Sequence, residues 1–416
     1  MSGISVLIFT GTTPGIGDGP GRNTPEKSHR MAGKIKTAVL IIALLLMLLP
    51  AGCSSDNSTD SSVSALEEHL TGSMELKYAD QFHVNYYDDG IAVVEIEDGL
   101  RYLVNEGAEE LPEWLPEEET EGMTLITAPA QSVYLAASSA MDLIDAAGAI
   151  GSVVMTSTQE KEWAIDKIRD LVASDTIHYV GKYRAPDYEA LLEGDVDLAI
   201  ESTMIYHSPQ VKEEIEELGI PVLVERSSYE SDPLGRLEWI KLYGLLLGKS
   251  AEAESFFSEA VEKINSVDTD SIQDPPSVAF FSVNSNGSVV VRKPGDYVTK
   301  MIETAGGTYA LDGITEEENA LSTMNMQMEA FYDKAVDADI LIYNSTIEGG
   351  LDQISDLTAL SDRFEDFKAV KEGRVWCTEA STFQKTTGAA DMTVEMNRIF
   401  AGAEDDSGME YFHLLR

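Results

Sequence analysis

Residues 234–264 read LGRLEWIKLYGLLLGKSAEAESFFSEAVEKI, a stretch in which no strand signal occurs. Apolar side chains recur at the spacing of one helical face, at Leu237, Ile240, Tyr243 and Leu247. Gly248 is the only residue expected to interrupt the pattern. The stretch therefore predicts one long linking helix, about twice the mean length of a globular helix.

On the amino-terminal side of this stretch, strand and helix signals alternate from Met123 onward. Short apolar runs predict strands at 125–126, 177–180, 196–200 and 222–224. Helices are expected from Ser138, from Pro186-Asp187, and from Ser208-Pro209, where an N-cap residue precedes a proline. Such alternation is typical of a parallel α/β lobe. Three runs before this lobe, at 82–84, 91–96 and 101–104, predict a small antiparallel meander.

After Pro275-Pro276 the same alternation returns. Strands are expected at 278–283, 289–291, 339–343 and 374–376, and helices from Asp296, at 329–336 and at 390–400. The predicted fold class is therefore α/β, with two parallel-sheet α/β lobes joined by a long linking helix. Residues 74–232 form the first lobe with its meander, 233–266 the linking helix, and 267–416 the second lobe.

The amino terminus carries an export signal. Two lysines after Met31 precede an apolar run at 38–49, which is too short to span a bilayer as a helix. Ala51-Gly52-Cys53 follows, and it resembles a bacterial lipobox, which implies that Cys53 is acylated and that residues 31–52 are a lipoprotein signal peptide. An ordinary leader with an incidental cysteine is the alternative. We expect residues 1–30 to be a non-native upstream extension and 53–73 to be a polar tether that does not fold.

Composition narrows the classes of function. The 416 residues include 43% hydrophobic ones, as a globular core requires, so a disordered chain is excluded. The 29 basic and 73 acidic residues give a net charge of −44, which makes nucleic acid an improbable partner. Two cysteines exclude a disulfide scaffold and argue against a zinc cluster built on cysteine, and Cys377 is expected to have no disulfide partner.

Taken in order, several segments resemble the substrate-binding lipoproteins of bacterial ABC importers, in the helical-backbone class that carries iron-siderophore complexes, haem and cobalamin. The resemblance covers roughly residues 75–416 and depends on segments at 126–129, 137–140, 186–189, 195–200, 218–222, 238–244, 305–307 and 369–376. Val196-Asp197 and Ala338-Asp339 stand where the family often has Pro-Asp, and we expect these departures to bear on ligand identity.

The resemblance implies binding without catalysis. It predicts that the two lobes capture an iron chelate, haem or corrinoid between them, with no cofactor and no resident metal. The expected partners are a membrane permease and its ATPase, and the protein is expected to be a lipid-anchored monomer at the outer face of the cell membrane. In the family, one glutamate on each lobe meets arginines of the permease. Glu189 and Glu329 match these positions, although a carboxylate in the first turn of a helix also stabilises the helix by itself.

Basic residues are scarce, and several follow predicted strands. Lys182 and Arg184, Arg226, and Arg292 with Lys293 are expected at the carboxyl ends of strands, which is where open parallel sheets bind ligands. Guanidinium groups there suit an anionic ligand, although salt bridges to neighbouring acids are the alternative. Aromatic residues that could stack on a macrocycle accompany the same loops: Tyr134, Tyr183, Tyr206, Tyr229, Tyr297, Trp376 and Phe383.

Other functions remain open at this point. A free-metal site needs several converging ligands, and only His83, His178 and His207 lie outside the leader, the tether and the terminus. His178 or His207 could still ligate the iron of a bound haem. A surface-anchored hydrolase would share the leader, but no nucleophile elbow, P-loop or His-Glu-x-x-His motif occurs. An extracellular ligand-sensing subunit would carry the same sequence features.

Overall fold

A pair of helices, of which the first is buried along its whole length, occupies the middle of the chain. In this computed structural model, which describes residues 64–107, 110–314 and 323–416, α7 (Pro233–Leu246) and α8 (Ser250–Asn265) replace the predicted single helix. The backbone turns at Gly248 (φ 68°), where Lys249 N–H donates to Gly244 O. The pair is antiparallel, because Lys241 of α7 reaches Glu254 of α8 at 3.1 Å. The prediction of one continuous helix was wrong because Gly248 reverses the chain.

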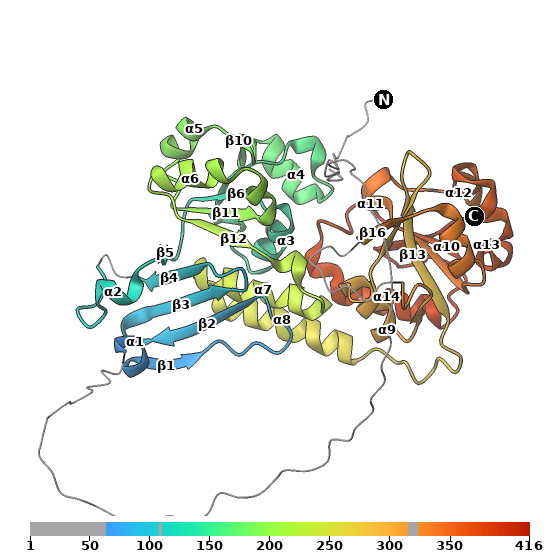
Figure 1. The fold of residues 1–416 in the computed structure, drawn as a ribbon, viewed down its shortest axis with the longest axis horizontal. Helices are drawn as coiled ribbons and strands as arrows, with labels where there is room; N and C mark the ends of the chain where they lie inside the picture. Colours follow the sequence, from blue (N-terminus) through green and yellow to red (C-terminus); the bar gives the residue numbers. More distant parts are fainter. Residues whose placement is uncertain (1–63, 108–109, 315–322) are drawn as a thin grey trace, which may run out of the picture. The chain divides into compact units, whose positions relative to one another are not determined.

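The amino-terminal sheet has five strands in sequence order (Figure 1). They are β1 (Leu70–Ser73), β2 (Phe82–Tyr87), β3 (Ile91–Ile96), β4 (Arg101–Glu106) and β5 (Thr124–Ala128). The predicted meander is confirmed as β2 to β4. However, β5, which we assigned to the first lobe, pairs in parallel with β4.

Part of the predicted tether is folded. Residues 65–73 form α1 (Ala65–Glu68) and β1. The carboxylate of Glu119, in α2 (Glu117–Thr120), accepts hydrogen bonds from Ser64 Oγ and from the N–H groups of Ala65 and Leu66. These bonds lower the pKa of Glu119. Composition alone missed this element because its partners lie about fifty residues further along the chain. Cys53 and the leader lie outside the described residues.

The sheet of the first lobe is parallel, in the order β12-β11-β6-β7-β8. Its strands are β6 (Val133–Leu135), β7 (Val153–Thr156), β8 (His178–Tyr179), β11 (Leu198–Ser202) and β12 (Val222–Glu225). The sequence missed β6 and β7. A hairpin of β9 (Gly181–Lys182) and β10 (Ala185–Pro186) follows β8. The helices are α3 (Ser138–Ala146), α4 (Asp166–Ala173), α5 (Tyr188–Glu193) and α6 (Pro209–Glu217).

The sheet of the second lobe is mixed. Its order is β16-β14-β13-β17-β18-β19, with β15 paired to β13. The pairings of β13 with β15, of β13 with β17 and of β17 with β18 are parallel. The pairings β13–β14, β14–β16 and β18–β19 are antiparallel, so the prediction of a parallel sheet holds for the central pairings. The strand β14 runs antiparallel to β13 because the turn at 284–288 is too short for a crossover.

The elements of the second lobe have the following bounds. The strands are β13 (Ser277–Val283), β14 (Val289–Arg292), β15 (Thr308–Tyr309), β16 (Thr323–Met326), β17 (Ile340–Tyr343), β18 (Val375–Thr378) and β19 (Phe412–Leu414). The helices are α9 (Tyr297–Thr304), α10 (Met328–Ala335), α11 (Ser345–Glu348), α12 (Ile354–Leu360), α13 (Lys368–Glu372) and α14 (Ala389–Phe400).

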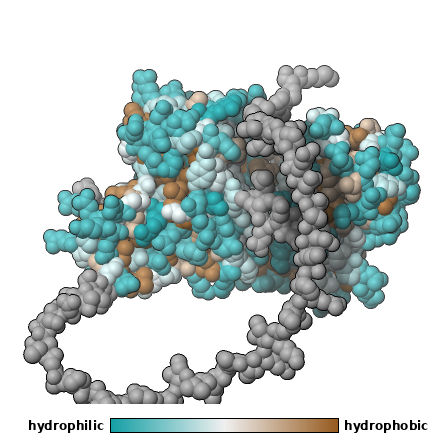
Figure 2. Space-filling view, in the orientation of Figure 1, coloured by the Kyte–Doolittle hydropathy of each residue, from teal (hydrophilic) through white to brown (hydrophobic). Residues whose placement is uncertain are grey.

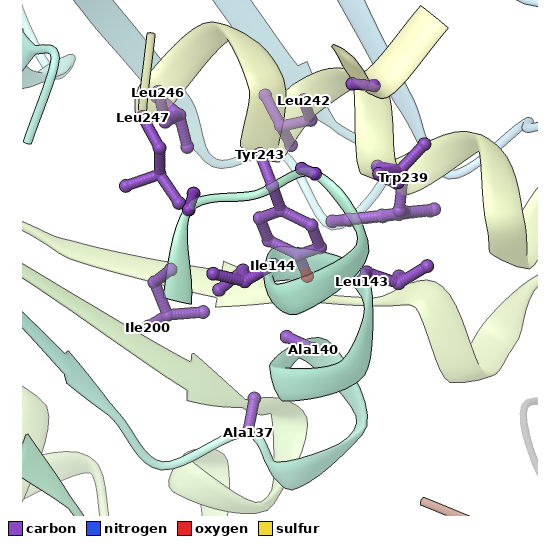
Figure 3. Close-up of a cluster of buried hydrophobic side chains, with 14 of the residues drawn as sticks. Ala137, Ala140, Leu143, Ile144, Ile200, Trp239, Leu242, Tyr243, Leu246 and Leu247 are labelled. Atoms are coloured by element: carbon purple, nitrogen blue, oxygen red, sulfur yellow. The ribbon is translucent and has the colours of Figure 1, made fainter. Parts of the chain in front are cut away.

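The helix α7 is buried along its whole length and packs on α3. Figure 3 shows the ring of Tyr243 directed at Ala140, Leu143 and Ile144 of α3. The coloured part of the face shown in Figure 2 is largely hydrophilic, in keeping with the excess of acidic residues. No helix among the described residues has the length and apolar character that crossing a bilayer requires.

Candidate functional site

The two predicted docking glutamates occupy equivalent positions. Glu189 is the second residue of α5, and Glu329 is the second residue of α10. Both side chains are exposed, and each helix leads directly into a central parallel strand, β11 or β17. The positive end of the helix dipole favours a carboxylate at both places. The equivalence arises because each lobe repeats the same helix-to-strand unit.

Asp197 and Asp339, which follow these helices, have a structural role. The Asp197 carboxylate accepts the N–H groups of Gln131 (2.8 Å) and Ser132 (3.0 Å), just before β6. Asp339 likewise accepts Ser277 N–H at 2.8 Å, at the first residue of β13. Each aspartate therefore ties the amino ends of two parallel strands together. The departures at Val196-Asp197 and Ala338-Asp339 lie at this amino end of the sheets, and their expected bearing on ligand identity stays a prediction.

Arg226, Tyr206 and Tyr229 come together at the carboxyl ends of β11 and β12. The Arg226 guanidinium lies 4.2 Å from the centre of the Tyr229 ring and 3.8 Å from the Asp98 carboxylate. Tyr206 donates its hydroxyl hydrogen to the same Asp98, in the turn between β3 and β4. Burial is the main cause that raises the pKa of Tyr206, and the hydrogen bond to Asp98 and the charge of Asp98 raise it further. The β3–β4 turn therefore supplies Arg226 with a carboxylate partner that the sequence did not reveal.

The predicted cations Lys182 and Arg184 lie on the β9–β10 hairpin that precedes α5. Both side chains are exposed, and neither forms an ion pair with another described residue. Tyr183 between them is half-buried and packs against the core of the first lobe. The alternative of a salt bridge to Asp187 does not hold, because the Asp187 side chain caps α5 by accepting Ala190 N–H.

Arg292 lies at the end of an antiparallel strand. Because β14 is antiparallel, Val291 pairs with Phe281 inside the sheet, and Arg292 follows it away from the carboxyl end of β13. Its guanidinium lies 3.5 Å from the buried Asp296 carboxylate, as the alternative of a salt bridge required. Lys293 also has a contact with another group. Arg292 and Lys293 do lie at the carboxyl end of β14, as predicted, but because β14 is antiparallel to β13 this end does not coincide with the carboxyl end of β13.

The aromatic residues divide between core and surface. Trp376 lies within β18 and is 2% exposed, so its ring is part of the core and offers no stacking face. Tyr134 is also fully buried. Phe383 is 49% exposed, in the loop after β18. Cys377, next to Trp376, is a buried free thiol whose pKa burial raises to about 11.

Tyr297 contacts Arg236, a residue that the sequence analysis missed. The guanidinium of Arg236, on α7, lies 4.1 Å from the centre of the Tyr297 ring. Arg236 is 5% exposed, and its Nε has no hydrogen-bond partner. The two residues line a small hollow with Thr382, Phe383, Lys385, Thr386, Ala389 and Met392. Arg236 does not follow a strand, and the signal in the sequence is a single arginine within the apolar stretch 234–247.

One further buried acid stands apart from any partner. Glu201, in β11, is completely buried, and neither carboxyl oxygen accepts a hydrogen bond from a described group. Burial raises its pKa from an ordinary 4.5 to about 8. Glu201 is therefore neutral at pH 7.

The described residues contain no cluster of three or more His, Cys, Asp or Glu side chains that could hold a metal ion. His178 pairs with Asp175 at 2.7 Å and His83 lies 3.7 Å from Glu97, so each histidine is engaged with one acid on the surface. His207 is exposed.

The profile of the periplasmic binding protein family matches residues 133–382 of the chain. An uncharacterized lipoprotein of Methanocaldococcus jannaschii is 24% identical over 367 residues, which cover 82% of this chain and 86% of the relative.

Solved structures share the fold. A periplasmic haem-binding protein, HutB of Vibrio cholerae, is 16% identical and has a TM-score of 0.53, with 64% of this chain and 98% of that chain covered. A periplasmic catecholate-siderophore binding protein, VctP of the same organism, is 13% identical with a TM-score of 0.53, covering 74% and 99%. The α/β fold class and the predicted family are confirmed, and so is binding without catalysis, since the family consists of solute-binding proteins.

Proposed function

Because the chain belongs to the periplasmic binding protein family, we propose that it is the solute-binding component of an ABC importer that captures an iron chelate, haem or corrinoid. It holds this ligand between its two α/β lobes and delivers it to a membrane permease and its ATPase. The haem and siderophore ligands named for structural neighbours support this ligand class.

The observation that carries the delivery step is the equivalence of Glu189 and Glu329. Two exposed carboxylates at the same position of repeated units form a matched pair for basic residues on a two-part permease. Exposed charges of this kind direct encounter and orientation more than they add affinity. The proposal places the protein outside the cytoplasmic membrane, anchored through a lipid on Cys53, and the lipoprotein name of the M. jannaschii relative supports such an anchor.

A binding panel tests the proposed ligand class. The purified chain is titrated with ferric siderophores, haemin and cobalamin, with tryptophan fluorescence and thermal stability as readouts. One member should bind at a ratio of one to one and raise the melting temperature, because a ligand that binds only the folded state stabilises it. A hydrolytic or redox activity without binding of any member would contradict the proposal.

A further inference from the structure

Arg236 is a buried cation without a charge partner. Within residues 64–107, 110–314 and 323–416 its guanidinium forms no ion pair and no side-chain hydrogen bond, and its one charge-related contact is the face of Tyr297 at 4.1 Å. A buried charge without an ionic partner is unfavourable, because it has lost its hydration. A cation–π contact offsets only part of this cost. The folded protein therefore contains a buried positive charge that no described negative group neutralises.

The residues around Arg236 explain why no acidic group of the described chain neutralises its charge. The hollow beside it has no Asp or Glu among its described lining residues, although the chain has 73 acidic residues. Its second cation, Lys385, is already paired with Glu410 at 2.5 Å. The nearby Arg292 is paired with Asp296. Arg236 is thus the cation of this region that has been left uncompensated.

The hollow also offers an unused polar group. Thr382 Oγ1 is buried, lines the same hollow and has no hydrogen-bond partner, whereas Thr386 Oγ1 already donates to Ser139 O. The volume of the hollow is about 10 Å³, about that of one water-sized group. It can therefore admit one oxygen of a ligand's terminal group, but not the body of a ligand. The half-exposed Phe383 forms part of its wall.

We propose that Arg236 and Thr382 form an anion subsite that receives a carboxylate of the bound solute. A carboxylate accepts hydrogen bonds from a guanidinium in its own plane and from a hydroxyl, which are the two groups available here. This inference rests on the proposed function and deepens it. It assigns the solute to the carboxylate-bearing chelates and macrocycles, and it places the charge recognition on the central helix α7.

Formate, the smallest carboxylate, tests the subsite without knowledge of the solute. In the full chain, sodium formate replaces sodium chloride at constant ionic strength while the melting temperature is followed. The wild type should show a saturating increase of a few degrees, and Arg236→Met should show none. Without formate, Arg236→Met should melt about 1–3 °C above the wild type, because an unpaired charge has been removed. A lower melting temperature, or an equal formate response in both proteins, would overturn the proposal.

Arg292→Met is the matched control. It removes a paired guanidinium near the same Tyr297 ring, so it should destabilise the protein and leave the formate response intact. A loss of the response in this variant as well would place the effect elsewhere and count against Arg236.

Haemin and its dimethyl ester then compare one macrocycle with and without free carboxylates. Where haemin binds, esterification should weaken it about tenfold or more in the wild type and leave Arg236→Met unaffected. The two proposals fail differently: a formate response without binding of any panel member contradicts the proposed ligand class alone. Panel binding without a formate response contradicts the subsite alone.

Discussion

The N–H group of Tyr78 donates a 2.8 Å hydrogen bond to the fully buried carboxylate of Glu238 on α7. The same carboxylate accepts the N–H groups of Lys77 and Ala79, and it pairs with Lys241 at 3.4 Å. Glu230 continues the pattern, because it accepts the N–H groups of Asp80 and Gln81. Burial raises the pKa of Glu230 to about 7, although the hydrogen bonds that it accepts favour its charged form and act in the opposite direction. Two glutamates thus hold the segment before β2 against the central helix.

Replacement of Glu238 should therefore destabilise the protein. Glu238→Gln turns an amide NH₂ toward N–H donors and leaves Lys241 with a weaker partner, so the free energy of unfolding should fall by about 2–4 kcal/mol. Denaturant titration measures this change. Glu254→Gln is the control, because Glu254 pairs with the same Lys241 but is 59% exposed, and it should cost less than about 1 kcal/mol. Equal effects of the two changes would contradict a special role for Glu238.

The buried Glu201 should make stability depend on pH. Its pKa is about 8 when folded and near 4.5 when exposed, so between these values the folded state retains a proton that the unfolded state has lost. Its contribution is fully present below pH 4.5 and declines as the pH rises through 8. Glu201→Gln removes this dependence, so its advantage over the wild type should grow from about 1 kcal/mol at pH 5 to roughly 5 kcal/mol at pH 9.

Chemical denaturation across this pH range measures the difference. The exposed Glu213→Gln in α6 is the control and should follow the wild type at every pH. A difference for Glu201→Gln that does not change with pH would show that Glu201 is ionised in the folded protein.

Charge reversal tests the predicted docking pair. Glu189→Arg and Glu329→Arg together should abolish uptake of the bound solute by intact cells, while the affinity of the purified protein for that solute stays unchanged. Each reversal opposes the helix dipole and should cost at most about 1 kcal/mol of stability. Glu193→Arg, at the exposed end of α5, is the control and should preserve uptake. Lost affinity in the double variant would place these residues in the binding site.

The close packing of α7 on α8 depends on Gly244. A Cβ atom added there would lie 2.7 Å from Cβ of Ala253, so Gly244→Ala must separate the helices. We expect a loss of about 1–3 kcal/mol, although Ala is intrinsically the better helix former by about 1 kcal/mol. Thermal unfolding checks the sign. In the double variant with Ala253→Gly, much of the loss should be recovered, and stabilisation by Gly244→Ala alone would contradict the packing argument.

The kinds of element and many of their ends could be predicted from short stretches of sequence. The helices α5 and α9 begin directly after Asp187 and Asp296, as expected, and the two aspartate side chains cap them. Gly219 follows the end of α6 with a φ of 84°. These features depend on residues within one turn of each other, so the local sequence determines them. The order of strands and helices was sufficient for the α/β class, and the resemblance of several sequence segments to a known family indicated the family.

Tertiary contacts decided the rest. The direction of β14 placed Arg292 within the sheet, pairing in β18 buried Trp376, and the β3–β4 turn brought Asp98 to Arg226. Arg236 could be identified as a candidate anion-binding residue only from the structure, because the hollow beside it has no carboxylate among its described lining residues. Whether a charged or aromatic side chain meets a partner, the core or open space depends on residues that are distant along the chain. Local propensity depends on a residue and its neighbours in the sequence. It therefore cannot predict contacts between residues that come together only in the folded chain.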